Sequence, residues 1–256
     1  MEEKKIETSI KNLIEVFFKA GDVSIDLRAK GLSKHLKKDN TPVTNGDIEV
    51  NNILLNSLKK INPNIPIVSE ETYENKNINL ETFWLVDPID GTYDYANNRD
   101  EFTINAGLII NNAASAGIIY APAKKRMFYS YGKGSAFEYT KDETINLSNK
   151  PSRKSKYLKF ISYSTKIKPE IQKIYDDLGV KENIRMKSSL KFCVVAAGEY
   201  DGYVAEPRAY EWDIAAGHAI LEHSGGTVTD FEGNEILYGK KDLKNPSIIL
   251  KNKNIS

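Results

Sequence analysis

Hydrophobic residues recur every three or four positions near the start of the chain. This spacing is typical of an amphipathic helix, and it is carried by Ile6, Ile10, Leu13, Ile14, Phe17 and Phe18. The polar residues 37–47 include Pro42 and Gly46, which predict a turn rather than a regular element. A second helix is expected from about Asp47. Its buried side would carry Ile48, Ile53, Leu54 and Leu58.

Short apolar runs and polar turns fill the rest of the chain. Strands are expected over residues 65–68, 83–86, 102–110, 114–120, 126–131, 136–139, 159–162, 202–204, 227–230 and 247–250. Helices are expected over residues 169–178, 188–198 and 212–223. Because strands and helices do not alternate regularly, the pattern favours layered helices and sheets over a barrel. The polar residues 146–156 are the best candidate for a boundary between two halves.

Composition and charge narrow the class of protein. The chain has 256 residues, enough for one large domain, and its net charge of +1 favours neither a nucleic acid polymer nor an anionic membrane as a partner. We expect no membrane span and no signal peptide, because no run of about eighteen apolar residues occurs and the N-terminus lacks an apolar core. The single cysteine, Cys193, excludes an intrachain disulfide and a cysteine-based zinc site, which fits a cytoplasmic location.

Three segments rich in acids, residues 68–71, 84–92 and 211–217, are candidates for chemistry. In the second, Asp87 and Asp90 stand three apart across a predicted turn and can converge on one point. Gly91 permits close backbone approach, and the amides of Gly91 and Thr92 would start a short helix. Carboxylates beside such amides suit a metal-bridged phosphate, and ligands that are all oxygen favour Mg²⁺ over zinc. Taken singly, each segment also fits an ordinary turn or, for Asp213, a helix cap.

Taken together, these motifs resemble those of the inositol monophosphatase superfamily of Mg²⁺-dependent phosphatases. The matching sequences are Glu-Glu after a strand, Trp-Leu-Val-Asp-Pro-Ile-Asp-Gly-Thr and Trp-Asp-Ile-Ala-Ala-Gly, in the order of the family. Residues 39–47 are similar to its D-x-S-P-V-T-x-x-D segment. The resemblance implies an α+β fold, a layered α/β/α/β/α sandwich. It also implies one phosphatase domain, with a metal-binding half over about residues 1–148 and an α/β half over about residues 149–256.

Within the superfamily, residues 101–105, 117–122, 188–193 and 212–219 resemble the CysQ-type 3′(2′),5′-bisphosphate nucleotidases. Those enzymes convert adenosine 3′,5′-bisphosphate to AMP and phosphate. The chain departs from them at Ala205, where they usually carry an arginine for the second phosphate. Arg208 is the substitute that we expect, whereas Glu206 stands where inositol monophosphatases place an acid that binds a hydroxyl. An inositol 1-phosphate or sugar-phosphate phosphatase is therefore the alternative, and an inactive sensor of phosphorylated ligands is an alternative of another class.

The resemblance also implies roles for individual residues. Two or three Mg²⁺ ions would be held by Glu70, Asp87, the carbonyl of Ile89, Asp90 and Asp213. Thr92, hydrogen-bonded to Asp47, would orient the attacking water and relay its proton, and Glu70 would assist catalysis. The substrate would contact Glu70, Ile89, Asp90, Gly91, Thr92, Ser188, Ser189, Lys191, Glu206, Arg208 and Asp213. The partner is a small phosphorylated molecule, and a second copy of the chain is expected because the family often forms homodimers.

Overall fold

The fold is known from a computed structural model, which describes residues 1–37, 41–74, 80–140, 143–150 and 156–255. The helices are α1 (Glu3–Lys30), α2 (Asn45–Ile61), α3 (Thr92–Ala96), α4 (Pro169–Leu178), α5 (Leu190–Ala196) and α6 (Glu211–His223), with a 3₁₀ turn, η1 (Pro122–Lys124). The first strands are β1 (Lys34–Leu36), β2 (Pro42–Thr44), β3 (Ile67–Ser69), β4 (Phe83–Asp90), β5 (Thr103–Ile110), β6 (Ala113–Ala121), β7 (Arg126–Ser130), β8 (Ala136–Tyr139) and β9 (Thr144–Asn146). The remaining strands are β10 (Leu158–Ser162), β11 (Val180–Arg185), β12 (Gly202–Ala205), β13 (Thr227–Thr229) and β14 (Ile248–Lys251).

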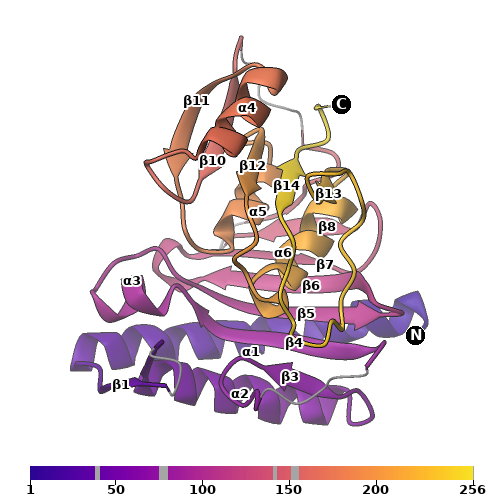
Figure 1. Ribbon diagram of the computed structural model, residues 1–256. Helices are drawn as coiled ribbons and strands as arrows, with labels where there is room; N and C mark the ends of the chain where they lie inside the picture. Colours follow the sequence, from indigo (N-terminus) through magenta and orange to yellow (C-terminus); the bar gives the residue numbers. More distant parts are fainter. Residues whose placement is uncertain (38–40, 75–79, 141–142, 151–155, 256) are drawn as a thin grey trace.

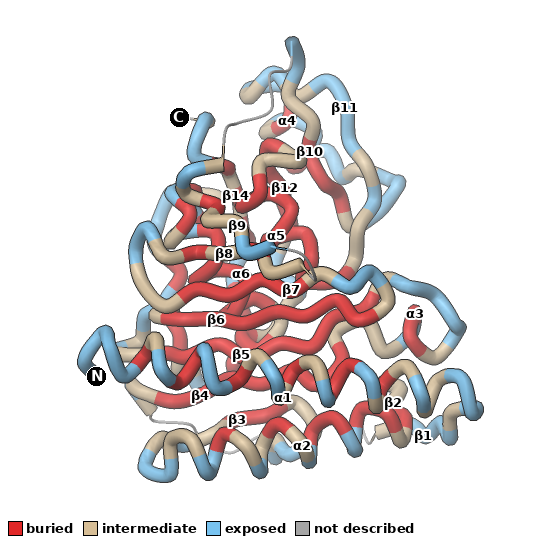
Figure 2. Tube along the Cα trace, turned by 180° about the vertical axis from the view of Figure 1, so that it is seen from behind, coloured by how far each residue is buried: buried red, intermediate tan, exposed pale blue. Residues whose placement is uncertain are grey.

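Strands β3 to β9 form a seven-stranded sheet in chain order. Neighbouring strands of this sheet run antiparallel, except that β3 and β4 run parallel. Helix α6 packs on one face, and α1 and α2 pack on the other (Figures 1 and 2). Because helices cover both faces of the sheet, both faces are buried. The sequence of β4 fits this environment, since its first four residues are all apolar. Alternate side chains enter the two cores: Phe83 and Leu85 pack on the α6 side, and Trp84 and Val86 on the α1 and α2 side.

The start of α2 is fixed by a reciprocal cap. Thr44 is the N-cap and its hydroxyl accepts from the amides of Gly46 and Asp47, while the Asp47 carboxylate accepts from the Thr44 amide at 2.8 Å. This arrangement satisfies donors that a helix start would otherwise leave unpaired. It also buries Asp47 completely, next to the end of β4.

Helix α6 lies unusually close to the seven-stranded sheet. A Cβ on Gly117 would stand 2.3 Å from the carbonyl oxygen of Ala216, and one on Gly107 would stand 2.7 Å from the Cβ of Ala215. Side chains at these two strand positions would force the helix away from the sheet. The glycines therefore bring the start of α6, with Asp213, to the end of β4.

A second sheet, in the order β11-β10-β12-β14-β13, packs on the other side of the α5 and α6 layer. Strand β10 pairs in parallel with β11 and β12, and the remaining pairs are antiparallel. Helix α4 covers the outer face, where Phe160, Val204, Ile171 and Tyr175 form a small core. The layers are thus helix, sheet, helix, sheet and helix, which confirms the predicted α+β sandwich.

Several local predictions from the sequence were wrong. Ile48, expected on the buried side of α2, is 46% exposed. Residues 42–44 are strand β2, paired with β1, because the hairpin supplies partners that the turn interpretation ignored. Asp87 and Asp90 are not joined by a turn: β4 continues to Asp90 with a register irregularity between the two acids. Strand β11 was missed because its exposed residues, such as Lys181 and Glu182, hide the alternation expected of a buried strand.

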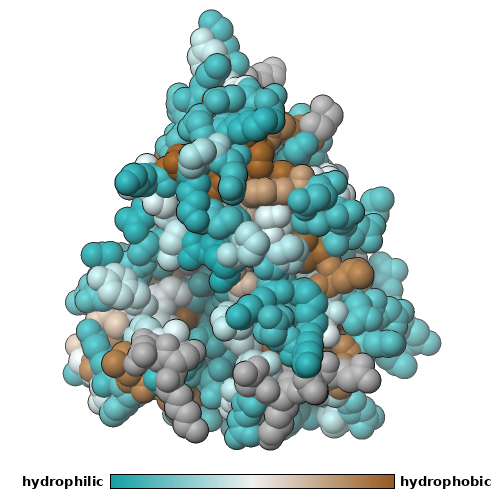
Figure 3. Space-filling model, in the orientation of Figure 1, coloured by the Kyte–Doolittle hydropathy of each residue, from teal (hydrophilic) through white to brown (hydrophobic). Residues whose placement is uncertain are grey.

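Some expectations lie partly outside the described residues. Asp39 and Asn40, at the start of the first motif, are among them, as are residues 151–155 of the expected boundary. Strand β9 is the last of the seven-stranded sheet along the chain, and β10 is the first of the second sheet; the division of the chain into two halves stays a prediction. Within the part of the chain that the structure describes, no helix has the length and apolar character needed to cross a membrane. The face in Figure 3 is mostly hydrophilic, with hydrophobic side chains in small groups.

Candidate active site

Three carboxylates from distant parts of the chain converge at one point. Asp87 and Asp90 extend from the end of β4, and Asp213 extends from the first turn of α6. One carboxylate oxygen of each lies within 4.8 Å of the others. We call Asp87, Asp90 and Asp213 the acid cluster. Two of the three are also held by backbone amides, since the Ser189 amide donates to Asp90 and the Tyr210 amide donates to Asp213 at 2.8 Å.

The protein environment penalises negative charge on this cluster. Burial raises the pKa of Asp87 well above its ordinary value, and the nearby charges of Glu70, Asp90 and Asp213 raise it further. Burial also raises the pKa of Asp213, with Asp90 and Glu70 as the next causes. Buried like charges are costly unless a cation neutralises them.

The residues of the acid cluster fit a divalent metal. Asp87 is 1% exposed, and its Oδ1 atom has no hydrogen-bond partner among the described residues. A buried ionised oxygen without a donor costs free energy that a cation would offset. Because the donors are all oxygen atoms, the site suits Mg²⁺ better than a metal that prefers nitrogen or sulfur.

Glu70 lies just beyond β3, which pairs in parallel with β4, so its carboxylate comes close to Asp87. Lys37 forms ion pairs with two carboxylates: its ammonium is 2.8 Å from Glu70 and 2.8 Å from Glu71. Burial raises the pKa of Glu71 to about 7, against the opposing effect of Lys37. Lys37 thus places a positive charge beside Glu70, a contact that no sequence motif predicted.

The expected hydrogen bond between Thr92 and Asp47 is present. The Thr92 hydroxyl is 2.9 Å from Oδ1 of Asp47 and 3.0 Å from the carbonyl oxygen of Ile89. Burial raises the pKa of Asp47, although Thr44 and Thr92 donate hydrogen bonds to it. A carboxylate with a raised pKa is a stronger base, so this pair is suited to accept a proton. Whether it does so in catalysis stays a prediction.

Gly91 connects β4 to α3 in the left-handed conformation, with φ of 94°. A Cβ at this position would also lie 2.8 Å from the carbonyl oxygen of Glu101. Both facts require glycine. The turn directs the chain so that Asp90, Gly91 and Thr92 follow one another along the edge of the site.

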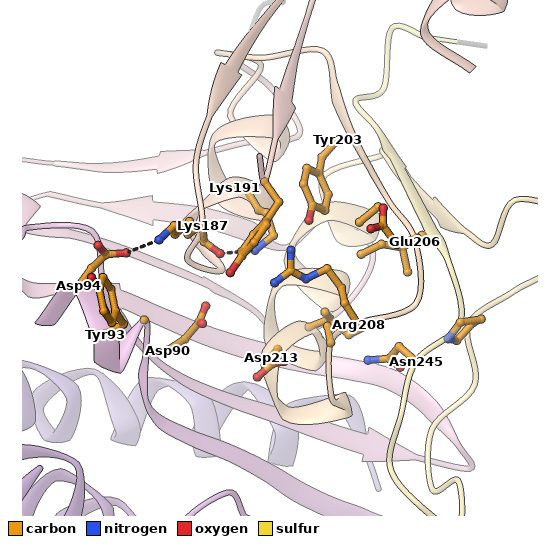
Figure 4. A pocket seen from close by; sticks show the side chains of 17 residues that line it. Asp90, Tyr93, Asp94, Lys187, Lys191, Tyr203, Glu206, Arg208, Asp213 and Asn245 are labelled. Carbon is orange, nitrogen blue, oxygen red and sulfur yellow. Dashed lines mark hydrogen bonds and ion pairs between the residues drawn. The ribbon is translucent and has the colours of Figure 1, made fainter. Parts of the chain in front are cut away.

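A cavity of about 220 Å³ opens from the acid cluster (Figure 4). Asp90, Gly91 and Asp213 line one end. We call the remaining part the outer cavity. It is lined chiefly by Tyr93, Asp94, Tyr163, Lys187, Lys191, Tyr203, Glu206, Arg208 and Asn245. The acid cluster and the outer cavity therefore form one continuous site with different charges at its two ends.

Three residues predicted to bind substrate, namely Lys191, Glu206 and Arg208, line the outer cavity. The guanidinium of Arg208 stacks on the ring of Tyr163, 3.0 Å from the ring centre, and Figure 4 shows it pointing into the cavity. Lys191 donates to the carbonyl oxygens of Lys187 and Ser188, each at 2.9 Å. Glu206 pairs with Lys168 at 2.6 Å, and this hydrogen bond lowers its pKa.

Ser188 and Ser189 occupy a different position from the expected one. Both are fully buried, and neither lines the cavity. The Ser189 hydroxyl lies 2.8 Å from Asn105 and 2.7 Å from Thr103, while its amide holds Asp90. The two serine side chains are therefore not placed to contact substrate in the cavity. Ser189 instead positions Asp90, a carboxylate of the acid cluster. The reason is that α5 begins inside the core rather than at the surface.

Other residues of the outer cavity were missed by the sequence analysis. Lys187 lies 3.6 Å from Asp94, which also binds Arg99 at 2.9 Å. Tyr163 of the outer cavity comes from the segment between β10 and α4, which carries no motif. Lys168 comes from the same segment and pairs with Glu206 without lining this cavity. No short-range pattern links these residues, because they meet only when the second sheet docks on the first.

Comparison with known proteins agrees with this geometry. The model of the inositol monophosphatase family matches residues 5–255. The chain belongs to the inositol monophosphatase family. Among curated members, 3′(2′),5′-bisphosphate nucleotidase CysQ of Salmonella typhimurium is 32% identical over 228 residues, which cover 87% of this chain and 91% of the relative. The CysQ of Buchnera aphidicola is 35% identical over 212 residues, 82% of this chain and 78% of the relative.

A solved structure of the family has the same fold. The crystal structure of CysQ from Bacteroides thetaiotaomicron superimposes with a TM-score of 0.79 at 28% identity. The match covers 96% of this chain and 97% of that protein. The layers described above thus belong to a fold that the two proteins share over nearly their whole length.

Proposed function

We propose that the protein is a Mg²⁺-dependent phosphomonoesterase that removes the 3′-phosphate of adenosine 3′,5′-bisphosphate. The products would be AMP and inorganic phosphate. The observation that carries the proposal is the continuous cavity, which has a metal-binding acid cluster at one end and the cations Arg208 and Lys191 at the other. A substrate with two separate phosphates fits these two ends. The nucleotidases named CysQ, at 32% and 35% identity, support the same substrate.

In this proposal Glu70, the acid cluster and the carbonyl of Ile89 hold the metal ions. Bound Mg²⁺ would neutralise the carboxylates, polarise the phosphoryl oxygens and lower the pKa of a water. The number of ions, two or three, is part of the proposal. The unpaired Oδ1 atom of Asp87 is the structural support, because a metal would give it a partner.

The chain's own residues would then orient the reaction. The hydroxyl of Thr92 accepts a hydrogen bond from the attacking water and donates its own proton to Asp47, which the 2.9 Å contact permits. The amides of Gly91 and Thr92 hold phosphoryl oxygens. The water oxygen bonds to phosphorus in line as the bond to the 3′ oxygen breaks, and that oxygen takes up a proton as it leaves. No covalent intermediate with the enzyme is needed.

At the other end, Arg208 and Lys191 would bind the second phosphate. A guanidinium forms paired hydrogen bonds with phosphate oxygens, and stacking on Tyr163 restricts its rotamers before the substrate arrives. Arg208 would thus replace the arginine that is missing at Ala205. The cavity wall at Tyr163 and Tyr203 offers aromatic surface for the nucleoside.

Release of phosphate from a panel of monoesters in the presence of Mg²⁺ tests the proposal. We expect kcat/KM for adenosine 3′,5′-bisphosphate to exceed that for inositol 1-phosphate by about a hundredfold, because only the former uses the outer cations. Glu206 favours the second candidate, a sugar-phosphate phosphatase, since a carboxylate in the cavity can accept a hydrogen bond from a sugar hydroxyl. Faster turnover of inositol 1-phosphate would establish that alternative. Binding without turnover of any ester would establish the sensor.

Two further expectations belong to the same proposal. The only cysteine of the sequence, Cys193, is buried and unpaired, which suits a reducing compartment such as the cytoplasm. Family resemblance also favours a homodimer. Fractionation of the native cells and light scattering of the purified protein measure these two properties directly.

A further inference from the structure

The charges of the outer cavity are paired unequally. Each acid of the outer cavity has a cation partner: Asp94 binds Arg99 and Lys187, and Glu206 binds Lys168. The local field of these carboxylates is therefore largely cancelled.

Two cations of the outer cavity are in the opposite situation. Among the described residues, neither Arg208 nor Lys191 has a carboxylate within ion-pair distance. Arg208 contacts the face of Tyr163, and Lys191 contacts backbone carbonyls. The exposed guanidinium of Arg208 is therefore available to an anion that enters the cavity, whereas burial lowers the pKa of Lys191 against the opposing effect of Asp90 and Asp213.

Glu206 is the residue that would oppose such an anion. It lies two positions before Arg208 in the loop between β12 and α6, and both residues line the same cavity. Its side chain is 31% exposed. An unpaired carboxylate at this point would repel a phosphate bound to Arg208, because the low polarisability of a cavity wall weakens charge interactions less than bulk water does.

The partner that prevents this repulsion comes from another element. Lys168 is the residue before α4, and its ammonium is 2.6 Å from Oε1 of Glu206. A second, smaller cavity of about 100 Å³ is lined by both members of this ion pair, whereas only Glu206 of the pair lines the first cavity. Lys168 therefore acts on the site through Glu206, from the far side of the cavity wall.

We propose that Lys168 determines substrate specificity by pairing with Glu206, so that the outer cavity accepts a second anionic group beside Arg208. Without the pair, Glu206 would repel that group and the site would suit a neutral hydroxyl. Lys168 is a positioning residue, because it reaches the substrate only through Glu206. The inference rests on the proposed function and specifies which residue tunes it.

The test uses two substrates that differ only in the second phosphate, adenosine 3′,5′-bisphosphate and adenosine 3′-monophosphate. Lys168→Met should lower kcat/KM for the bisphosphate about tenfold, mainly through KM, and leave the monophosphate within about twofold. Lys166→Met is the matched control, because Lys166 lines the smaller cavity but has no ion pair with Glu206. It should leave both substrates within about twofold.

Rescue separates charge from folding. In Lys168→Met combined with Glu206→Gln, both members of the pair are neutral, so kcat/KM for the bisphosphate should return to within about threefold of the Glu206→Gln value. The loss in Lys168→Met should also shrink between 50 mM and 500 mM salt, as expected of a partly exposed charge. Equal losses on both substrates, or no rescue, would overturn the inference.

The design distinguishes this inference from the proposed function. Inositol 1-phosphate and inositol 1,4-bisphosphate repeat the comparison without a nucleoside. If the wild-type protein ignored nucleotides but the Lys168→Met loss persisted for the inositol bisphosphate alone, the nucleotidase proposal would fail and the role of Lys168 would stand. If the wild type gained nothing from a second phosphate in either pair, the role of Lys168 would fall.

Discussion

At the acid end of the cavity, Asp87, Asp90 and Asp213 project from the end of β4 and the start of α6, where Asp87 is buried and the other two are partly buried. At the outer end, Glu206 and Arg208 project from a loop and remain partly exposed. The acid end is rigid because sheet hydrogen bonds and close helix packing fix its backbone. The outer end depends on side-chain pairs, which another sequence of the family can exchange without disturbing the fold.

The contrast separates two parts of the function. Groups that make or break bonds need fixed positions, so they lie at the ends of first-sheet strands and in the first turns of α2, α3 and α6, where displacement would disrupt the core. Groups that select a substrate lie where the second sheet and α4 meet the site. Variants at the two ends should therefore differ in which kinetic constant they change.

The largest effect is expected at the acid cluster. Asp90→Asn should lower kcat about a thousandfold or more, because the neutral amide is a poor metal ligand. The amide oxygen can still accept from the Ser189 amide, so the fold should persist. Phosphate release at saturating substrate measures the loss, and circular dichroism checks folding.

Asp177→Asn is the control for that variant, since Asp177 is an exposed residue of α4 with a simple ion pair to Lys173. It should retain full activity. Asp90→Asn with activity within about tenfold of the wild type would remove this residue from the metal site.

The next effect concerns the Thr92 and Asp47 pair. Thr92→Val keeps the shape of the side chain but loses the hydroxyl, so kcat should fall about a hundredfold while KM changes little. Thr92→Ser retains the hydroxyl and serves as the control. Combining Thr92→Val with Asp47→Asn should add little further loss, because the two residues act in one relay. Losses that multiply would show that they act independently.

A smaller effect, confined to one substrate, is expected at the outer end. Arg208→Met should raise KM for adenosine 3′,5′-bisphosphate roughly thirtyfold, since a phosphate would lose a paired charged contact. Adenosine 3′-monophosphate, which lacks that phosphate, is the internal control. If kcat fell equally for both esters, the division of labour between the two ends would be wrong.

The smallest effect is on stability and depends on pH. Without metal, the folded protein keeps protons on Asp87 and Asp213 that the unfolded chain releases, because burial and neighbouring acids raise both pKa values above 3.8. The free energy of unfolding should therefore fall as pH rises above about 3.8 in EDTA. Mg²⁺ at a hundred times its Kd should restore about 2.7 kcal/mol, which raises Tm by about 5 to 10 °C.

Thermal melts at several pH values, with Mg²⁺ and with EDTA, measure this dependence. In Asp213→Asn the slope against pH should be shallower and the Mg²⁺ effect smaller. A Tm that is independent of Mg²⁺ at pH 8 would mean that the acid cluster does not hold the ion.

The sequence predicted the acid end well, for a local reason. Asp87, Asp90 and Thr92 follow a continuous apolar run over residues 83–86, and Asp213 lies at the start of a helix of mostly apolar residues. The element on which each of these residues lies is set by neighbours within a few residues. The Thr92 and Asp47 hydrogen bond was likewise implied by the family motif, and the structure contains it.

The outer end could not be predicted in the same way. Lys168 and Lys187 carry no motif, and the polar residues around them resemble any solvated loop. Ser189 was misinterpreted because a serine before a helix usually faces solvent, whereas here it is buried against Asn105 and Thr103. The error came from burial, which local pattern does not reveal.

By itself the sequence determined the order and kind of most elements and the identity of the acids, because hydrophobic period, caps and turns act over a few residues. Only the tertiary structure decided which charges meet: Lys37 with Glu70, Lys168 with Glu206, and Asp213 with the end of β4. The physical reason is that these contacts depend on how closely layers pack. The absence of a side chain at Gly107 and Gly117 sets the distance between the first sheet and α6, and residues near these glycines in the chain do not indicate that distance.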